Sequence, residues 1–291
     1  MDYFFYLLFA FLYLYLYLRY RYYKAYPSKN ILITGGTDGI GKAWVEKYAK
    51  NSCINKIYVV GRNIERLTEL QTFILNKYNK NIHCIVCDLD NNINLDIFNV
   101  AKLDVDTIVY SAGVSYPMAL LSENVDIELT NNIINVNCIS TTIIINYLLQ
   151  NNNNNIKNIL LIGSGNGIIS TGIPFYSVYA ASKSYIDQYA KSISVEYPYI
   201  NIQVHHPFLV CSKMSKINKP SLFVPSADTF VNYSYNEFLK FNNNNISKVP
   251  YIYHYLQYII IKMLPYNFVK SYLYATNYKL YKKANLKTRS I

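Results

Sequence analysis

The sequence has few acidic residues and few charges of either sign. Only 15% of its 291 residues are charged, and 17 Asp and Glu stand against 28 Lys and Arg, which gives a formal net charge of +11. Low charge combined with 52% hydrophobic residues favours membrane association. No basic stripe with interleaved aromatics runs through the centre of the chain, and clusters of positive charge lie near its two ends. This distribution argues against nucleic acid and favours a membrane surface as a partner.

Cysteine is also sparse. Five cysteines, an odd number without framework spacing, argue against a disulfide-stapled secreted domain and fit a reducing compartment. Cys84 and Cys87 form a C-x-x-C pair, but they lie in and beside an apolar run that is typical of a buried strand. No second Cys pair or nearby His cluster completes a metal site, so we predict no metal.

The N-terminal segment is apolar and aromatic. Residues 3–18 carry no charge and consist almost entirely of Tyr, Phe and Leu, and they are followed by Arg19 and Arg21. As a helix this run spans about 24 Å, short of the roughly 30 Å hydrocarbon core, but the tyrosines that follow can extend it. The residues around the run do not fit a cleaved signal peptide. We predict a membrane anchor over residues 1–26, either spanning the membrane or lying in its plane, with the positive flank placing the rest of the chain in the cytosol.

Beyond Pro27, short apolar runs alternate with longer helix-like segments. The runs are residues 30–34, 57–61, 82–86, 107–111, 158–163 and 202–206, and the helical segments are residues 42–50, 65–78, 127–150 and 177–197. Because the runs carry few charges, they fit strands that are covered on both faces. The alternation predicts an α/β fold, a Rossmann-type doubly wound parallel sheet over residues 27–291, with ligands at the carboxyl ends of the strands. Two Asn-rich runs, residues 151–155 and 242–245, fit surface loops.

The pattern changes after the last run. Residues 208–225 are irregular and contain two of the nine prolines, and a third, Pro207, directly precedes them. Residues 249–264 are strongly apolar but interrupted by polar residues, and they fit a core helix, a membrane-resting helix or a lid over the substrate. We therefore expect a C-terminal helical substrate or lid region from about residue 208.

A glycine run follows the first apolar strand. Gly35, Gly39 and Gly41 have the spacing G-x-x-x-G-x-G at the predicted start of a helix. Without Cβ atoms the backbone can turn tightly and approach a pyrophosphate, whose charge then meets the N–H groups of the helix N-terminus. In this strand-turn-helix context the run predicts a dinucleotide site.

The second and third strands end in residues that suit the adenosine half of a cofactor. Arg62 follows the second strand, where no Asp or Glu is present to accept from a ribose hydroxyl, so it favours the 2′-phosphate of NADPH over NADH. The alternative is a solvated loop arginine. Asp88, followed by Leu89, fits either a hydrogen bond to the adenine or a plain turn.

Tyr179 and Lys183 stand four residues apart on a predicted helix, and therefore on one helical face. Reduction of a carbonyl needs an acid at its oxygen, and lowering the pKa of a phenol from about 10 to near 7 takes about 4 kcal/mol. One positive charge at about 4 Å supplies about that much at an effective dielectric of 20. Ser164, after the fifth strand, can orient the substrate oxygen. Asn137, in the long helix before that strand, is a candidate for holding a water that links Lys183 to solvent.

These residues resemble the short-chain dehydrogenase/reductase family, and within it the membrane branch of very-long-chain 3-oxoacyl-CoA reductases and 17-beta-hydroxysteroid dehydrogenases. The similarity is carried by the glycine run with Asp38, the segments 112–117 and 179–183, and above all the stretch 212–226. The resemblance implies a catalytic tetrad of Asn137, Ser164, Tyr179 and Lys183, with NADPH/NADP+ as cofactor. The cofactor-binding residues that it implies are Thr34, Gly35, Gly39, Ile40, Gly41, Arg62, Asp88, Leu89, Ala112, Gly113, Tyr179, Lys183, Pro207, Val210 and Ser212.

Two departures from the family pattern stand out. The family's Asn-Asn-x-Gly after the fourth strand is Tyr110-Ser111-Ala112-Gly113 here, so Ser111 replaces the Asn that steadies the cofactor-side strands. The interval from Ser164 to Tyr179 is also about two residues longer than usual, which implies a small loop insertion. Neither change removes a tetrad residue, so both bear on rate rather than on reaction type.

The resemblance implies NADPH-dependent reduction of the 3-oxo group of long-chain 3-oxoacyl-CoA in fatty-acid elongation. The alternatives are a 17-beta-hydroxysteroid or other lipid-ketone dehydrogenase and, outside enzymes, a catalytically silent membrane scaffold. The expected partners are an acyl-CoA or steroid substrate, a lipid membrane, a second copy of the chain as a homodimer, and other elongation enzymes, but no nucleic acid. The expected location is the endoplasmic reticulum membrane with the catalytic domain in the cytosol, and the tail Lys287-Thr288-Arg289-Ser290-Ile291 resembles a dibasic retrieval signal.

Overall fold

The computed structural model describes residues 23–24, 26–90, 93, 95–96, 98, 103–151, 155–241 and 245–288. The predicted anchor, residues 1–26, therefore lies almost wholly outside the described residues. Residues 152–154 and 242–244 of the Asn-rich runs and the last three residues of the basic tail lie outside them too.

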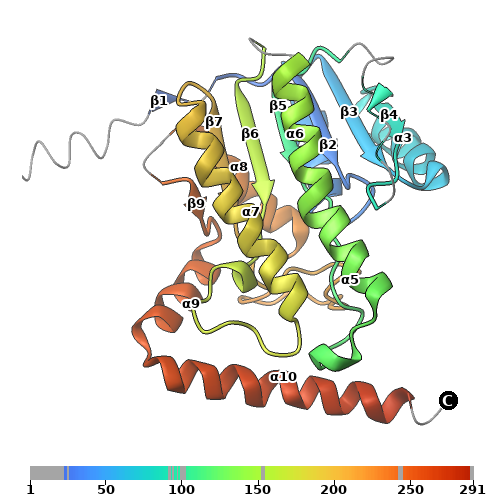
Figure 1. Cartoon of the computed structure of the whole chain (residues 1–291). Coiled ribbons are helices and arrows are strands. Elements are labelled where there is room, and N and C mark those ends of the chain that lie inside the picture. Colours follow the sequence, from blue (N-terminus) through green and yellow to red (C-terminus); the bar gives the residue numbers. More distant parts are fainter. Residues whose placement is uncertain are drawn as a thin grey trace, which may run out of the picture.

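A parallel sheet forms the centre of the molecule (Figure 1). Within the described residues it has seven strands in the order β4-β3-β2-β5-β6-β7-β9, and every pairing is parallel. The strands are β2 (Asn30–Thr34), β3 (Lys56–Gly61), β4 (His83–Val86), β5 (Thr107–Tyr110), β6 (Asn158–Ile162), β7 (Asn201–His205) and β9 (Ser247–Lys248). The order reverses between β2 and β5, which is the position where doubly wound sheets bind ligands.

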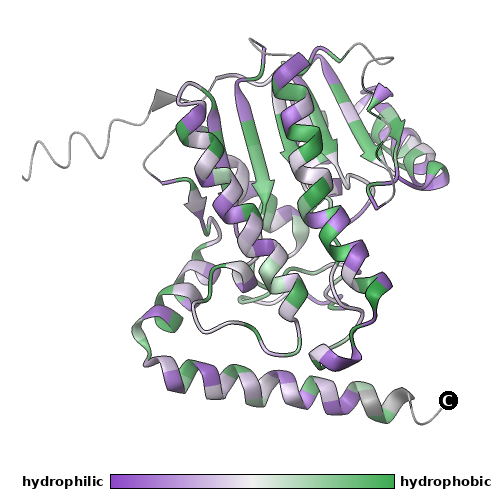
Figure 2. Cartoon of the chain, in the orientation of Figure 1, coloured by the Kyte–Doolittle hydropathy of each residue, from purple (hydrophilic) through white to green (hydrophobic). Residues whose placement is uncertain are grey.

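Helices cover both faces of the sheet and bury its two sets of side chains. On one face lie α2 (Gly39–Ala49), α3 (Ile64–Tyr78) and α8 (Ala227–Phe238), and on the other α5 (Ile127–Ile134), α6 (Ser140–Asn151) and α7 (Ser177–Glu196). Because side chains alternate along a strand, Ile31 and Ile33 belong to the same core cluster as Trp44 of α2, whereas Leu32 belongs to the cluster of α6 and α7. Figure 2 shows the apolar strands between striped helices.

One helix, residues 127–151, is the only described helix long and apolar enough to cross a membrane. It consists of α5, a short π-helical segment η2 (Asn135–Ile139), and α6. Over half of its apolar window is buried inside the molecule, and its side chains join the core beneath the sheet. Its apolar character is therefore explained by packing.

The C-terminal region is helical, as expected. A two-stranded antiparallel pair, β1 (Tyr23–Lys24) with β8 (Lys240–Phe241), precedes α9 (Ile252–Met263) and α10 (Tyr266–Thr288). In Figure 1, α10 lies across the end of the molecule to which the strand arrowheads point. In α9 only His254 is buried, so α9 is not a core helix.

Candidate functional site

The glycine run forms a tight turn between β2 and α2. Gly35 has φ +65°, and a Cβ built on it would lie 2.8 Å from the Cα of Ala112. A Cβ on Gly41 would lie 2.2 Å from the carbonyl oxygen of Gly35. Asp38 caps α2 by accepting from the N–H of Gly39 at 2.7 Å, and no acidic residue lies in the first turn of the helix. The glycines at 35 and 41 thus allow close backbone packing at a helix N-terminus, which suits a bound pyrophosphate.

Thr34 ties this turn to the neighbouring strand. Its buried hydroxyl accepts from the N–H groups of Ser111, at 3.2 Å, and Ala112, at 3.1 Å. The Thr34 hydroxyl therefore joins the carboxyl ends of β2 and β5 by accepting from backbone N–H groups, whatever side chain residue 111 carries. Thr34 is among the predicted cofactor residues, but this bridge was not predictable, because a lone threonine at a strand end gives no pattern.

At the predicted adenosine end of the cofactor site, the guanidinium of Arg62 has no partner among the described residues. Arg62 is exposed at the end of β3 and makes no hydrogen bond or ion pair with any described residue. Asp88 is exposed too, and its carboxylate accepts from the N–H of Asp90 at 3.1 Å, while Leu89 is buried in the core. Arg62 is thus free to meet an anion, whereas Asp88 also has the local bond expected of a turn residue.

The four predicted catalytic residues lie together at the carboxyl ends of β5 and β6. The Nζ of Lys183 donates to the carbonyl of Ile162 at 3.1 Å and lies 6.0 Å from the centre of the Tyr179 ring. The Ser164 hydroxyl lies near the phenol of Tyr179, where it lowers the pKa of that phenol, and it accepts from the N–H of Asn166 at 3.2 Å. Asn137 completes the group, since its Oδ1 and the Lys183 Nζ would lie 3.3 and 3.2 Å from a Cβ on Gly113.

Burial controls the electrostatics of this group. Loss of solvent lowers the pKa of Lys183 to about 8, with a small opposing contribution from Cys138. Burial also raises the pKa of Tyr179, although the hydrogen bond from Ser164 works in the opposite direction. The structure thus differs from the expectation that Lys183 by itself brings the phenol near neutrality, because desolvation penalises the phenolate and the ammonium alike.

The side chain of Asn137 connects two elements of the site by hydrogen bonds. It lies in η2, and π-helical turns often occur at functional sites. Its amide donates to the Val114 carbonyl at 2.9 Å and to the Ser182 hydroxyl at 2.8 Å, and its Oδ1 accepts from the Val114 N–H at 2.8 Å. The side chain thereby joins the loop after β5 to α7. That Asn137 holds a water linking Lys183 to solvent stays a prediction.

The segment after β7 lies beside the catalytic group and the glycine run. The Pro207 carbonyl accepts from the N–H of Gly165 at 2.7 Å, and the Val210 carbonyl accepts from the Ser215 hydroxyl at 2.7 Å. Ser212 lies against the glycine run, because a Cβ on Gly39 would be 3.4 Å from the Ser212 Cβ. Ile40 is partly buried and packs against the core of α2. Pro207 therefore lies beside the strand end that bears Ser164, and Ser212 lies beside the glycine run.

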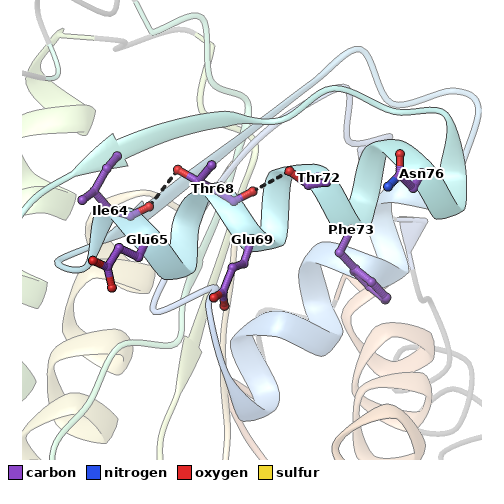
Figure 3. Close-up of a pocket in the computed structure, with 7 residues that line it drawn as sticks. All are labelled: Ile64, Glu65, Thr68, Glu69, Thr72, Phe73 and Asn76. Carbon is purple, nitrogen blue, oxygen red and sulfur yellow. Dashed lines mark hydrogen bonds between the residues drawn. The ribbon is translucent and has the colours of Figure 1, made fainter.

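Two further observations concern the described residues outside the tetrad. No group of three His, Cys, Asp or Glu that could hold a metal occurs among them. A hollow lies along the outer side of α3, away from the tetrad (Figure 3). There Thr68 and Thr72 donate to the carbonyls of Ile64 and Thr68, so their hydroxyls are already used by the helix.

The fold and the site define the class, and the chain belongs to the short chain dehydrogenase family, whose model matches residues 29–219. It is similar to the very-long-chain 3-oxoacyl-CoA reductase of Mus musculus, with 33% identity over 208 residues, 69% of this chain and 65% of that protein. It is also similar to very-long-chain 3-oxoacyl-CoA reductase-B of Danio rerio, with 30% identity over 210 residues, covering 69% and 65% of the two chains. The chain thus spans about 65% of the length of these relatives.

Solved structures support the fold. A structure described for 7beta-hydroxysteroid dehydrogenase stereoselectivity superposes with a TM-score of 0.71 at 18% identity, covering 84% of this chain and 96% of that one. A short-chain dehydrogenase from Sphingobium yanoikuyae in complex with NADPH gives a TM-score of 0.62 at 17% identity, covering 80% and 92%.

Proposed function

We propose that the protein is an NADPH-dependent reductase of the 3-oxo group of long-chain 3-oxoacyl-CoA, acting in fatty-acid elongation. One observation supports this most directly: a buried lysine, a phenol and a serine hydroxyl meet at the strand ends, beside a glycine turn shaped for a dinucleotide. The named relatives support the substrate, and the free Arg62 supports the 2′-phosphate form of the cofactor.

Each residue has a distinct task in this proposal. A bound reduced nicotinamide supplies the hydride to the carbonyl carbon. Ser164 hydrogen-bonds the carbonyl oxygen and orients it, and Tyr179 gives its phenolic proton to that oxygen. Lys183, whose pKa is about 8, is a suitable source of the proton that restores the phenol near neutral pH. Asn137 keeps the loop after β5 and the helix α7 in register.

The runner-up is a 17-beta-hydroxysteroid or other lipid-ketone dehydrogenase. A Caenorhabditis elegans relative whose name describes a steroid dehydrogenase is 27% identical over 243 residues, covering 80% of this chain and 90% of that protein. Acyl chains and steroids are both apolar, and the segment beyond Phe208 exposes apolar side chains such as Met214, Leu222 and Phe223. The same surface therefore fits either ligand.

A substrate panel tests the choice. The purified full-length protein in detergent is given NADPH and 3-oxoacyl-CoA esters of increasing chain length, with steroid ketones in parallel, and NADPH loss is followed. We expect turnover of the long acyl esters. Turnover of steroid ketones alone would contradict the acyl-CoA proposal in favour of the runner-up, and no turnover of any ketone would favour the scaffold.

We further propose that the protein resides at the endoplasmic reticulum membrane with its catalytic domain in the cytosol. The apolar segment 3–18 and its positive flank support the anchor and its orientation. The C-terminal helices add exposed apolar side chains, and the sequence contains no acidic residue after Glu237. Protease added to intact microsomes should digest the catalytic domain, whereas full protection would place it in the lumen.

A further inference from the structure

His206 is a buried polar residue directly behind the catalytic serine. It follows β7, it is fully buried, and its ring lies against the end of β6. A Cβ on Gly163 would lie 2.5 Å from the Nδ1 of His206. The glycine that precedes Ser164 therefore leaves the space that the imidazole occupies.

The ring contacts the peptide groups of Ser164 on one side. Its Nδ1 lies 3.3 Å from the Ser164 nitrogen and 3.1 Å from the Ser164 carbonyl oxygen. An unprotonated Nδ1 accepts from that N–H, and a protonated Nδ1 donates to that carbonyl. In either state of the ring, one hydrogen bond to the backbone of Ser164 is available.

On its other side the ring contacts α7. Its Nε2 lies 3.0 Å from the Oδ1 of Asp187 and 3.0 Å from the hydroxyl of Ser247. Although burial opposes it, hydrogen bonds from His206 and Lys191 hold the pKa of Asp187 below its usual range, so Asp187 is an acceptor. The proton of the neutral imidazole therefore belongs on Nε2.

Asp187 belongs to the helix that carries the catalytic pair. It follows Lys183 by four residues and Tyr179 by eight, so all three share one side of α7. Asp187, His206 and Ser164 thus form a chain of hydrogen bonds from that helix to the strand end that bears the serine. This chain fixes the Ser164 backbone, and with it the direction of the hydroxyl that meets Tyr179.

We propose that His206, held by Asp187, is a positioning residue that sets the Ser164 hydroxyl against Tyr179 for proton transfer. The proposal rests on the proposed carbonyl reduction for its kinetic effect. His206 touches neither the substrate nor the cofactor in it. Its effect passes through Ser164 alone.

Paired substitutions of His206 separate the two contacts. In His206→Asn the side-chain amide can occupy the place of Nδ1 and keep the hydrogen bond to the Ser164 backbone. In His206→Gln the longer side chain places its amide where Nε2 lies, so it keeps only the hydrogen bond to Asp187. We expect His206→Leu and His206→Gln to lower kcat about 10- to 100-fold, with KM and NADPH affinity within about twofold of wild type, and His206→Asn to keep most of kcat. A loss in His206→Asn as large as in His206→Leu would overturn the proposal.

A double-mutant cycle tests the route through Ser164. In a Ser164→Ala background, His206→Leu should change kcat by less than about twofold, because the hydroxyl that it positions is gone. Full additivity would overturn the proposal. His205→Leu is the matched control: this neighbouring buried histidine contacts Ser234 at 2.6 Å and Gln203 at 2.9 Å instead, so stability should fall while kcat is kept.

A measurement without turnover separates this inference from the proposed reaction. The chain has four histidines, so selective ¹⁵N-histidine labelling gives a resolvable set of ring signals for the full-length protein in detergent. We expect a neutral His206 to carry its proton on Nε2, with a ring signal that shifts in Asp187→Asn. A proton on Nδ1 of the neutral ring would overturn the proposal even if some ketone is reduced. If no ketone is reduced, the proposed function fails, and this spectrum still decides the His206 arrangement.

Discussion

The carboxyl edge of the sheet and the C-terminal helices hold their side chains in opposite ways. At the edge, Asn137 and Lys183 are buried and each donates to a specific backbone carbonyl. On α9, by contrast, Ile260 and Met263 are 57% and 79% exposed. Fixed polar contacts place a few atoms for one reaction, whereas an exposed apolar surface suits a large ligand or a membrane without specifying its shape.

The two regions meet at the segment after β7. There the Nδ1 of His254 accepts from the Phe208 N–H at 3.3 Å, and its Nε2 donates to the Leu209 carbonyl at 3.1 Å. Burial lowers the pKa of His254 to about 4, which keeps the ring neutral and able to make both bonds. The apolar helix α9 is thereby attached next to Pro207, so the proposed substrate region begins beside the proposed catalytic edge.

The largest effect should come from the phenol at the edge. Tyr179→Phe removes only the proton donor, so we expect turnover to fall about a thousandfold, within the range of general-acid catalysis, while NADPH binding is kept. The measurement is NADPH oxidation with a long 3-oxoacyl-CoA, together with a cofactor titration. Tyr176→Phe, a change to a partly buried tyrosine just before α7, is the matched control. Equal cellular function in Tyr179→Phe would favour the scaffold.

Arg62→Ala should have the next largest effect. If the free guanidinium binds a 2′-phosphate, its loss removes about 1.5–3 kcal/mol and weakens NADPH binding roughly ten- to a hundredfold, with NADH little changed. Affinities from cofactor fluorescence test this. Arg66→Ala, which removes an exposed arginine in the first turn of α3, should change neither affinity. Unchanged NADPH affinity in Arg62→Ala would make Arg62 a solvated loop residue and reopen the choice of cofactor.

The sheet and the proximity of Tyr179 to Lys183 were predictable because their signals are strong and local. Each of the six predicted strands matches an observed strand to within one residue at either end, since fully buried strands are continuous apolar runs. Tyr179 and Lys183 share a helix face because the spacing of four is fixed by helix geometry. The strand β9 has only two residues, too few for any pattern, so its place beside β7 was not predictable.

The missed contacts depend on tertiary structure. Thr34 joins Ser111 across 77 positions, and His206 reaches Ser164 across 42, and neither residue type is unusual at the end of a strand. The raised pKa of Tyr179 also differs from the sequence-based prediction. That prediction considered only the nearby charge of Lys183 and not the burial that the fold imposes. Composition and spacing show which groups are present, whereas desolvation depends on what surrounds them.

Lys183→Met should stabilise the cofactor-free protein at neutral pH. The pKa of Lys183 falls from 10.5 to about 8 on folding, so the unfolded chain binds more protons between these values and stability rises with pH across that window. Below about pH 8 the folded protein carries the full cost of the buried ammonium, which is about 3 kcal/mol from the pKa difference. Loss of the bond to the Ile162 carbonyl offsets part of this, leaving a gain of about 1–3 kcal/mol.

Thermal unfolding at pH 6.5 and pH 9.5 checks the sign. The advantage of Lys183→Met should be larger at pH 6.5 and shrink at pH 9.5, although the variant has no turnover. Lys219→Met, at an exposed lysine, should show no such pH dependence. A lower thermal stability of Lys183→Met than of wild type at pH 6.5 would mean that the buried ammonium does not destabilise the folded protein.

The smallest effect should come from the exposed face of α9. We expect removal of residues 1–26 to release the protein from membranes only in part, with α9 holding the remainder. Leu256, Ile260 and Met263 are exposed on α9, and changing all three to Asn removes apolar surface without touching the buried His254. The bound fraction of the truncated chain should then fall at least about fivefold, equivalent to about 1 kcal/mol, with turnover of a short 3-oxoacyl-CoA unchanged.

Vesicle flotation measures binding, and Val195→Asn, at an exposed valine on α7, is the control. If flotation is unchanged but long acyl chains lose their preference over short ones, α9 serves as a cover for the substrate rather than as a membrane contact.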